Sequence, residues 1–112
     1  MQRLPKRLIR GSQLTTTAVA YYTTQANVTT TISACTVTNT GAAVITVTMY
    51  LVPATLAPSA SNAVLAGRSL AVGESYNVAG AIGQTLEAGG AIYASASSAT
   101  SITLVASGYE QT

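Results

Sequence analysis

The chain has 112 residues and a net charge of +2, and its charged fraction is 7%, against about 25% in an ordinary soluble domain. It contains no His, Asp, Trp or Phe. The length is enough for one domain with one core, and the absent side chains exclude a Ser-His or Cys-His catalytic pair. We therefore predict a protein that is not an enzyme and that uses no cofactor or metal.

The chain begins with a basic segment. Four of its five cationic side chains fall within the first ten residues, and only Arg68 lies elsewhere. We predict a basic, extended N-terminal arm over residues 1–13 and a β-sandwich domain over residues 14–112. The residues of the arm that we expect to bind a partner are Arg3, Lys6, Arg7, Leu8, Ile9 and Arg10.

Three hypotheses compete for the role of this arm. It pairs with a neighbouring subunit, with its cations against acidic groups and its apolar side chains in pockets; it contacts the phosphates of a nucleic acid; or it has no role. We favour the first, because four cations alone bind phosphates weakly at physiological salt. The arm also lacks aromatic side chains that could stack on bases.

The next predicted strand, Leu14–Thr23, contains the adjacent residues Tyr21 and Tyr22. Successive side chains on a strand point to opposite faces, so one tyrosine should pack inward while the other meets solvent or a partner. Tyrosine is common at interfaces because it combines an apolar ring with a polar hydroxyl. Both tyrosines are therefore candidate interface residues, and plain core filling is the alternative.

Two long strands are predicted in the middle of the chain. Apolar and polar side chains alternate strictly in Ala43–Val52, as is typical of a half-buried strand, and Pro53 ends it because proline cannot donate to the ladder. In Thr29–Asn39 the alternation changes phase, which indicates a bulge or a strand buried on both faces. The Asn-Thr-Gly sequence at 39–41 predicts a turn that joins the two strands as an antiparallel hairpin.

Shorter strands follow, and no helix is predicted. A Leu-x-x-Gly-x-x-apolar pattern occurs at 70–76 and at 86–92, where glycine permits the chain to turn within few residues. The Ser-Ala-Thr sequence at 98–100 predicts a hairpin loop between the last two strands. These later strands are predicted at Ala63–Ala71, Ser75–Val78, Gln84–Leu86, Ala91–Ser97 and Ser101–Tyr109.

This spacing of short strands and turns predicts the fold class. Seven or eight strands with turns at roughly 8–12-residue intervals indicate an all-β protein, a single antiparallel β-sandwich. Its strand order is either jelly-roll or Ig-like, and the sequence leaves both open. Low charge weakens repulsion between molecules and lets strand edges associate, so we predict a subunit of an assembly rather than a free monomer.

Apart from the cations, the sequence contains few chemically reactive side chains. Cys35 is the only cysteine, which excludes an intramolecular disulfide, and its apolar surroundings in the sequence predict a buried, inert thiol. The carboxylates Glu74, Glu87 and Glu110 are scattered, and the first two fall in glycine turns, where we expect a solvated side chain. No apolar run approaches the length of a membrane-spanning helix.

Five stretches of the chain carry a resemblance to a known family: KRLIRGS at 6–12, YYT at 21–23, TVTNTGAAVITVTMYLVP at 36–53, SLAVGESYNV at 69–78 and LEAGGAIYASASSATSITLVASG at 86–108. They are similar to small structural proteins of tailed bacteriophages. The resemblance implies an all-β virion protein that assembles on the particle as capsid decoration (cement), neck or collar, or tail component. Its partners would be other virion proteins and copies of itself, and no catalytic residues are implied. We expect it to be made in the host cytoplasm, because the basic start is not followed by the unbroken apolar run of a secretory signal.

A carbohydrate- or receptor-binding β-sandwich module is the alternative function. The sandwich class hosts many binding modules, and a fold by itself does not give a function. The absence of Trp and the scarcity of aromatic side chains in the predicted loops count against sugar stacking. A nucleic-acid binder that acts through the arm is a third and less favoured hypothesis, and no membrane partner is expected.

Overall fold

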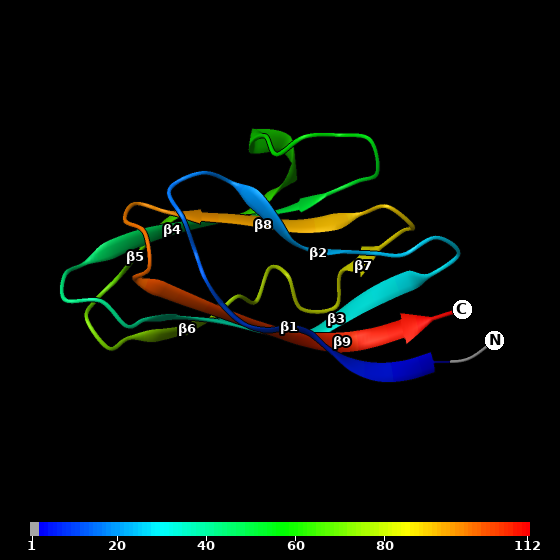
Figure 1. The fold of residues 1–112 in the computed structure, drawn as a ribbon, viewed down its shortest axis with the longest axis horizontal. Coiled ribbons are helices and arrows are strands. Elements are labelled where there is room, and N and C mark those ends of the chain that lie inside the picture. The colour runs from blue at the N-terminus through cyan, green and yellow to red at the C-terminus, as the bar shows by residue number, and fades with distance from the viewer. Residues whose placement is uncertain (1–2) are drawn as a thin grey trace.

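The computed structural model describes residues 3–112 as two antiparallel sheets (Figure 1). One sheet has the strand order β1-β9-β3-β6, with β7 also pairing with β3, and the other has the order β2-β8-β4-β5. The strands are β1 (Arg3–Gln13), β2 (Val19–Thr23), β3 (Thr29–Asn39), β4 (Ile45–Val52), β5 (Ala63–Leu70), β6 (Ser75–Asn77), β7 (Thr85–Leu86), β8 (Ala91–Ala96) and β9 (Ile102–Gln111).

A single hydrophobic core joins the two sheets. Its buried members come from both of them, and the Cys35 thiol on β3 lies 3.7 Å from the Met49 sulfur on β4. Alternation explains the burial: along β9 the side chains of Ile102, Leu104 and Ala106 are buried, and those between them are partly exposed. The all-β prediction with two antiparallel sheets is therefore confirmed, in a sandwich-like arrangement.

The predicted phase change in Thr29–Asn39 is a β-bulge. Ile32 pairs with Gly108 and Ala34 pairs with Ser107, so Ser33 is the extra residue on β3. Ser33 and Ala34 are both exposed, and the buried alternation resumes at Cys35. Of the two interpretations that the sequence left open for this strand, the bulge is the one present.

Both predicted hairpins are wrong. β3 pairs with β6, β7 and β9, whereas β4 pairs with β5 and β8, so the turn at 39–41 carries the chain from one sheet to the other. The loop at 98–100 likewise connects β8 in one sheet to β9 in the other. Alternation identifies a strand and its buried face but not the strand beside it, and turn residues suit a sheet-to-sheet crossing as well as a hairpin.

Most connections cross between the sheets. The strands β4 and β5 are adjacent in one sheet, and the long loop between them, which contains the 3₁₀ turn η1 (Ala60–Asn62), lies beyond that sheet on the side away from the other one (Figure 1). The strands β6 and β7 share one sheet as well, because they pair with different stretches of β3. Each remaining connection between consecutive strands carries the chain across the core.

Asn39 ties the two sheets together near β5 and β6. Its side-chain amide donates to the carbonyls of Ala43 and Leu70, at 2.8 and 3.0 Å, and its side-chain oxygen accepts the Gly41 backbone N–H at 2.9 Å. The side chain is fully buried, so each of these bonds replaces one that water would otherwise make. At the same edge the Arg68 guanidinium of β5 lies 4.3 Å from the ring centroid of Tyr76 on β6.

Candidate functional site

The basic segment predicted as an arm forms β1, the outer strand of its sheet. Over the described residues 3–13 it pairs antiparallel with β9, with register shifts between Arg7 and Ile9 and between Ile9 and Ser12. Because of the first shift, the adjacent side chains of Leu8 and Ile9 are both buried in the chain's own core. Residues 1–2 lie outside the described part, and binding of this segment to a neighbouring subunit stays a prediction.

The cations on β1 differ in how they are held. Lys6 forms an ion pair with Glu110 of β9 at 3.3 Å, and the Arg3 guanidinium lies 4.4 Å from the ring centroid of Tyr109. Arg7 and Arg10 are exposed, and neither forms an ion pair or a cation–π contact with any residue that the structure describes. The surface of β1 therefore carries positive charge that no ion pair within residues 3–112 neutralises.

An open groove of about 380 Å³ lies beside β1. It is hollow because its base carries small side chains: Ser33 is the bulged residue of β3, Ser107 lies opposite on β9, and Gly108 has no side chain. A Cβ atom at Gly108 would collide with the carbonyl oxygen of Thr31, so the close approach of β3 and β9 requires glycine there. The groove is lined by Pro5, Lys6, Arg7, Ser33, Ser107, Gly108 and Tyr109.

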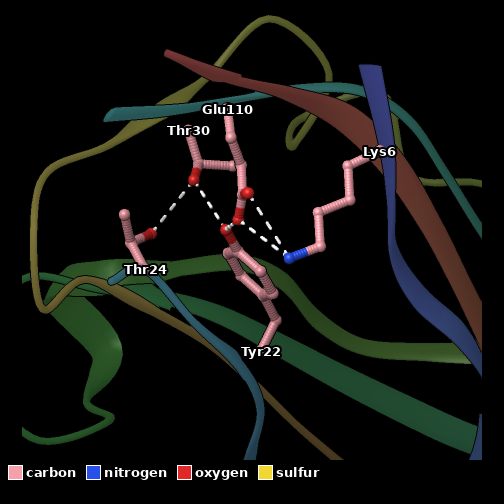
Figure 2. Close-up of polar contacts among 5 residues, drawn as sticks. All are labelled: Lys6, Tyr22, Thr24, Thr30 and Glu110. Carbon is pink, nitrogen blue, oxygen red and sulfur yellow. Dashed lines mark hydrogen bonds and ion pairs between the residues drawn. The ribbon is translucent and has the colours of Figure 1, made fainter. Parts of the chain in front are cut away.

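A polar network connects the two sheets behind β1 (Figure 2). The Tyr22 hydroxyl of β2 donates to the Glu110 carboxylate at 2.5 Å and lies 2.7 Å from the Thr30 hydroxyl of β3. Thr24 donates to Thr30 at 3.3 Å, and Lys6 reaches the same carboxylate from β1. Only 15% of the Glu110 side-chain surface is exposed, and its carboxylate contacts Tyr22 and Lys6 on the face of β9 that carries the buried residues.

The adjacent tyrosines both pack against the core. A register shift between Ala20 and Tyr22 on β2 interrupts the expected alternation, and neither ring is fully exposed. Burial raises the pKa of Tyr22, and its hydrogen bond to Glu110 raises that pKa further. The Tyr21 hydroxyl accepts the Thr15 backbone N–H at 3.2 Å. The structure thus assigns both residues intramolecular contacts, and a partner contact at either one stays a prediction.

The other ionisable groups do not gather into a site. Glu74 accepts the Ala71 backbone N–H at 2.7 Å and closes its own turn, and Glu87 is exposed. Burial raises the pKa of the Cys35 thiol to about 12, so this sulfur stays protonated at neutral pH. Within residues 3–112 no three acidic or cysteine side chains are grouped as metal ligands are.

Sequence reasoning found the cations but missed the groove and the network. Glu110 is one of three scattered carboxylates in the sequence, and nothing there indicates that it pairs with Lys6 or Tyr22. Ser33 carried a signal, because it lies where the alternation of β3 changes phase. Gly108 helps to form the groove only because β9 pairs with both β1 and β3. Local sequence patterns do not reveal that pairing.

No family model matches the chain, and no curated protein or solved structure is detectably similar to it. Among the described residues there is no helix with the length and apolar character needed to span a bilayer.

Proposed function

We propose that this chain is a non-enzymatic structural subunit of a tailed-phage particle, acting as capsid decoration, neck or collar, or tail component. The observation that carries the proposal is a rigid β body whose outer strand β1 bears cations without acidic partners among the described residues, next to an open groove. Such a surface suits contact with an acidic neighbouring subunit. The sequence resemblance to virion proteins points in the same direction.

The strand order supports a jelly roll as the finer description of the fold. In a jelly roll, two four-stranded sheets are built from two Greek keys, and the chain passes repeatedly between them. The orders β1-β9-β3-β6 and β2-β8-β4-β5 fit this pattern, with β7 continuing the edge that β6 begins. In an Ig-like order, several pairs of strands that are consecutive in the chain lie side by side in a sheet. In the described residues of this chain only one such pair, β4 and β5, lies side by side. Jelly rolls build viral capsid domains, and lectins use them as well.

Copurification with phage particles tests the function. A tagged copy of the chain, produced during infection, should remain with purified particles in a fixed ratio to the capsid protein. Arg7→Glu should lower this ratio at least fivefold, because it places negative charge on the contact surface. Arg68→Glu, which makes the same charge change at the β5 edge, is the control and should be incorporated normally. Absence of the unmodified chain from particles would refute the proposal.

Charge reversal is a sharper test than removal of residues 1–10. Such a truncation would remove most of β1 together with Leu8 and Ile9, whose side chains are buried in the core. Failure of the truncated chain to assemble would then report lost stability as much as lost contact. Arg7 is exposed, so its replacement leaves the core unchanged.

One observation favours the alternative, a carbohydrate-binding module. Tyr50 of β4 pairs directly with Tyr93 of β8, and both side chains are partly exposed on strands whose neighbouring residues Met49 and Ala94 are buried. Two aromatic rings on the outer face of a sheet offer a surface on which a sugar ring can stack. Specific binding on a glycan array that is lost in Tyr50→Ala and Tyr93→Ala, with normal binding by Tyr76→Ala, would establish this function instead.

A further inference from the structure

We propose that the groove beside β1 binds an extended, acidic segment of a partner polypeptide. The proposal deepens the proposed function, on which it rests for taking β1 as the contact surface. The structure supplies the charge, the shape and the polar groups of such a site, and the charge and the contacts of β1 disfavour two other occupants.

The charge around the groove is positive. Arg7 lines it and has no acidic partner among the described residues, and Arg3 lies at its end over the Tyr109 ring. Glu110 is the one acidic residue in β1, β9 and β3, and its carboxylate is engaged by Tyr22 and Lys6 on the inner side. A carboxylate that enters the groove therefore meets cations and no competing anion of these three strands.

The shape and chemistry suit a peptide carboxylate. The guanidinium of Arg7 can bind a carboxylate through two parallel hydrogen bonds. The Ser107 hydroxyl offers a further donor at the base, whereas the Ser33 hydroxyl already donates to the Ser107 carbonyl at 3.3 Å. A volume of about 380 Å³ holds a few residues of extended chain, at the small end of ordinary ligand sites.

A second copy of the chain is a poor occupant. Pairing two β1 strands would bring the cations of one copy against those of the other, and like charges on facing strands are destabilising. Pro5 and the two register shifts along β1 also disrupt the regular ladder that such pairing needs.

A nucleic acid is also disfavoured. The Tyr109 ring carries the Arg3 guanidinium on its face, so that face is closed to a stacking base. Lys6 is already paired with Glu110. The few cations that remain would make few phosphate contacts, and such binding is weak at physiological salt.

Fluorescence anisotropy with defined peptides tests the proposal. The probe is a labelled ten-residue peptide of alternating Glu and Ser, compared with a Gln and Ser peptide of the same length and with a labelled DNA duplex, at about 150 mM salt. We expect saturable binding of the Glu peptide and no saturable binding of the Gln peptide or of the duplex. Arg7→Gln should weaken it at least fivefold, whereas Arg68→Gln, the matched change at the β5 edge, should leave it unchanged.

A second variant separates the groove from general charge attraction. Ser107→Leu fills the groove without changing the net charge, and it too should weaken binding at least fivefold, with unchanged thermal unfolding as the check on folding. Equal binding of the Glu and Gln peptides, normal binding by Ser107→Leu, or tighter binding of DNA than of the Glu peptide would overturn the inference. If these results occur while Arg7→Glu still prevents incorporation into particles, the inference falls and the proposed function stands.

Discussion

The two edges of the sandwich are closed in different ways. At the β5–β6 edge, the uncharged amide of Asn39 bonds to backbone groups of both sheets, and Arg68 covers Tyr76. At the β1–β2 edge, ionisable groups make the link, because Tyr22 bonds to Glu110 and Lys6 pairs with the same carboxylate. The first edge is occupied by its own contacts, whereas the second keeps cations without ion-pair partners on its surface. The intramolecular contacts thus close the first edge, and the partner contact that we propose lies at the second.

The largest expected effect is at the uncharged edge. Asn39→Leu removes three hydrogen bonds and leaves the Gly41 N–H and the Ala43 and Leu70 carbonyls without their buried partner. We expect a loss of about 2–3 kcal/mol in the free energy of unfolding, since an unsatisfied buried group costs about 1–3 kcal/mol. The Leu70 carbonyl is the buried one, and the groups of Gly41 and Ala43, which lie nearer to solvent, add less. Urea denaturation measures it. Thr40→Ala, which alters an exposed neighbour, should cost far less, and equal losses would contradict this account.

A smaller loss is expected at the ionisable edge. Tyr22→Phe keeps the ring in place but removes the hydroxyl that bonds to Glu110 and Thr30. A hydrogen bond to a charged group contributes about 1.5–3 kcal/mol, and partial exposure of this network places the expected loss at its lower end. Tyr21→Phe is the matched control, because its hydroxyl accepts one bond from an exposed backbone group. Thermal unfolding that ranks Tyr21→Phe as the more destabilised variant would refute the network's role.

Alkaline pH should weaken the fold at Tyr22 in the ionisable edge and at Cys35 in the core. Burial raises the pKa of Tyr22 above its ordinary 10.0 and that of Cys35 from 9.0 to about 12. The unfolded chain therefore releases these protons at lower pH than the folded chain, so the stability they contribute is complete below pH 9.0 and is lost as the pH rises further. Denaturation midpoints should fall above that pH, less steeply in Cys35→Ala and Tyr22→Phe. A flat profile in the unmodified chain would count against this linkage.

The smallest effects concern two of the cations that have intramolecular partners, Lys6 and Arg68. Lys6→Met and Arg68→Met should each cost less than about 1 kcal/mol, because exposed ion pairs and exposed cation–π contacts are weak. The cost of Lys6→Met should shrink further in about 1 M salt, where charges are screened within a few ångströms. Arg10→Met, at a cation without an ion pair among the described residues, should change stability by no more than about 0.5 kcal/mol. A large loss in either paired variant would show that the charged contacts are stronger than exposed contacts normally are.

The sequence predicted most strands because their burial is one-sided and local. The predicted Thr29–Asn39 has the same bounds as β3, and Ala43–Val52 starts two residues before β4. The strand β1 was missed as part of the sandwich because its two register shifts destroy the alternation that marks a strand, and they bury the adjacent side chains of Leu8 and Ile9 together. The cations clustered on β1 instead led to the prediction of an extended arm outside the sandwich.

Strand partners and the candidate site were beyond local patterns. The bond between Tyr22 and Glu110 joins residues 88 positions apart, and the ion pair of Lys6 with Glu110 spans 104. Such contacts depend on which strands become neighbours, and turn chemistry gave the wrong neighbours for β3 and β4. The cations of the site were identifiable because charge is scarce in this chain.

The position of β9 between β1 and β3 has a consequence for how the protein is made. The ribosome produces Ile102–Gln111 long after it has produced both neighbouring strands, so these two strands have no central partner while the intervening chain is being synthesised. The first sheet is complete only when this late segment inserts, and contacts between distant parts of a chain slow its folding. Until that insertion, the backbone edges of β1 and β3 that pair with β9 have no partner in the sheet, and unpaired strand edges favour aggregation.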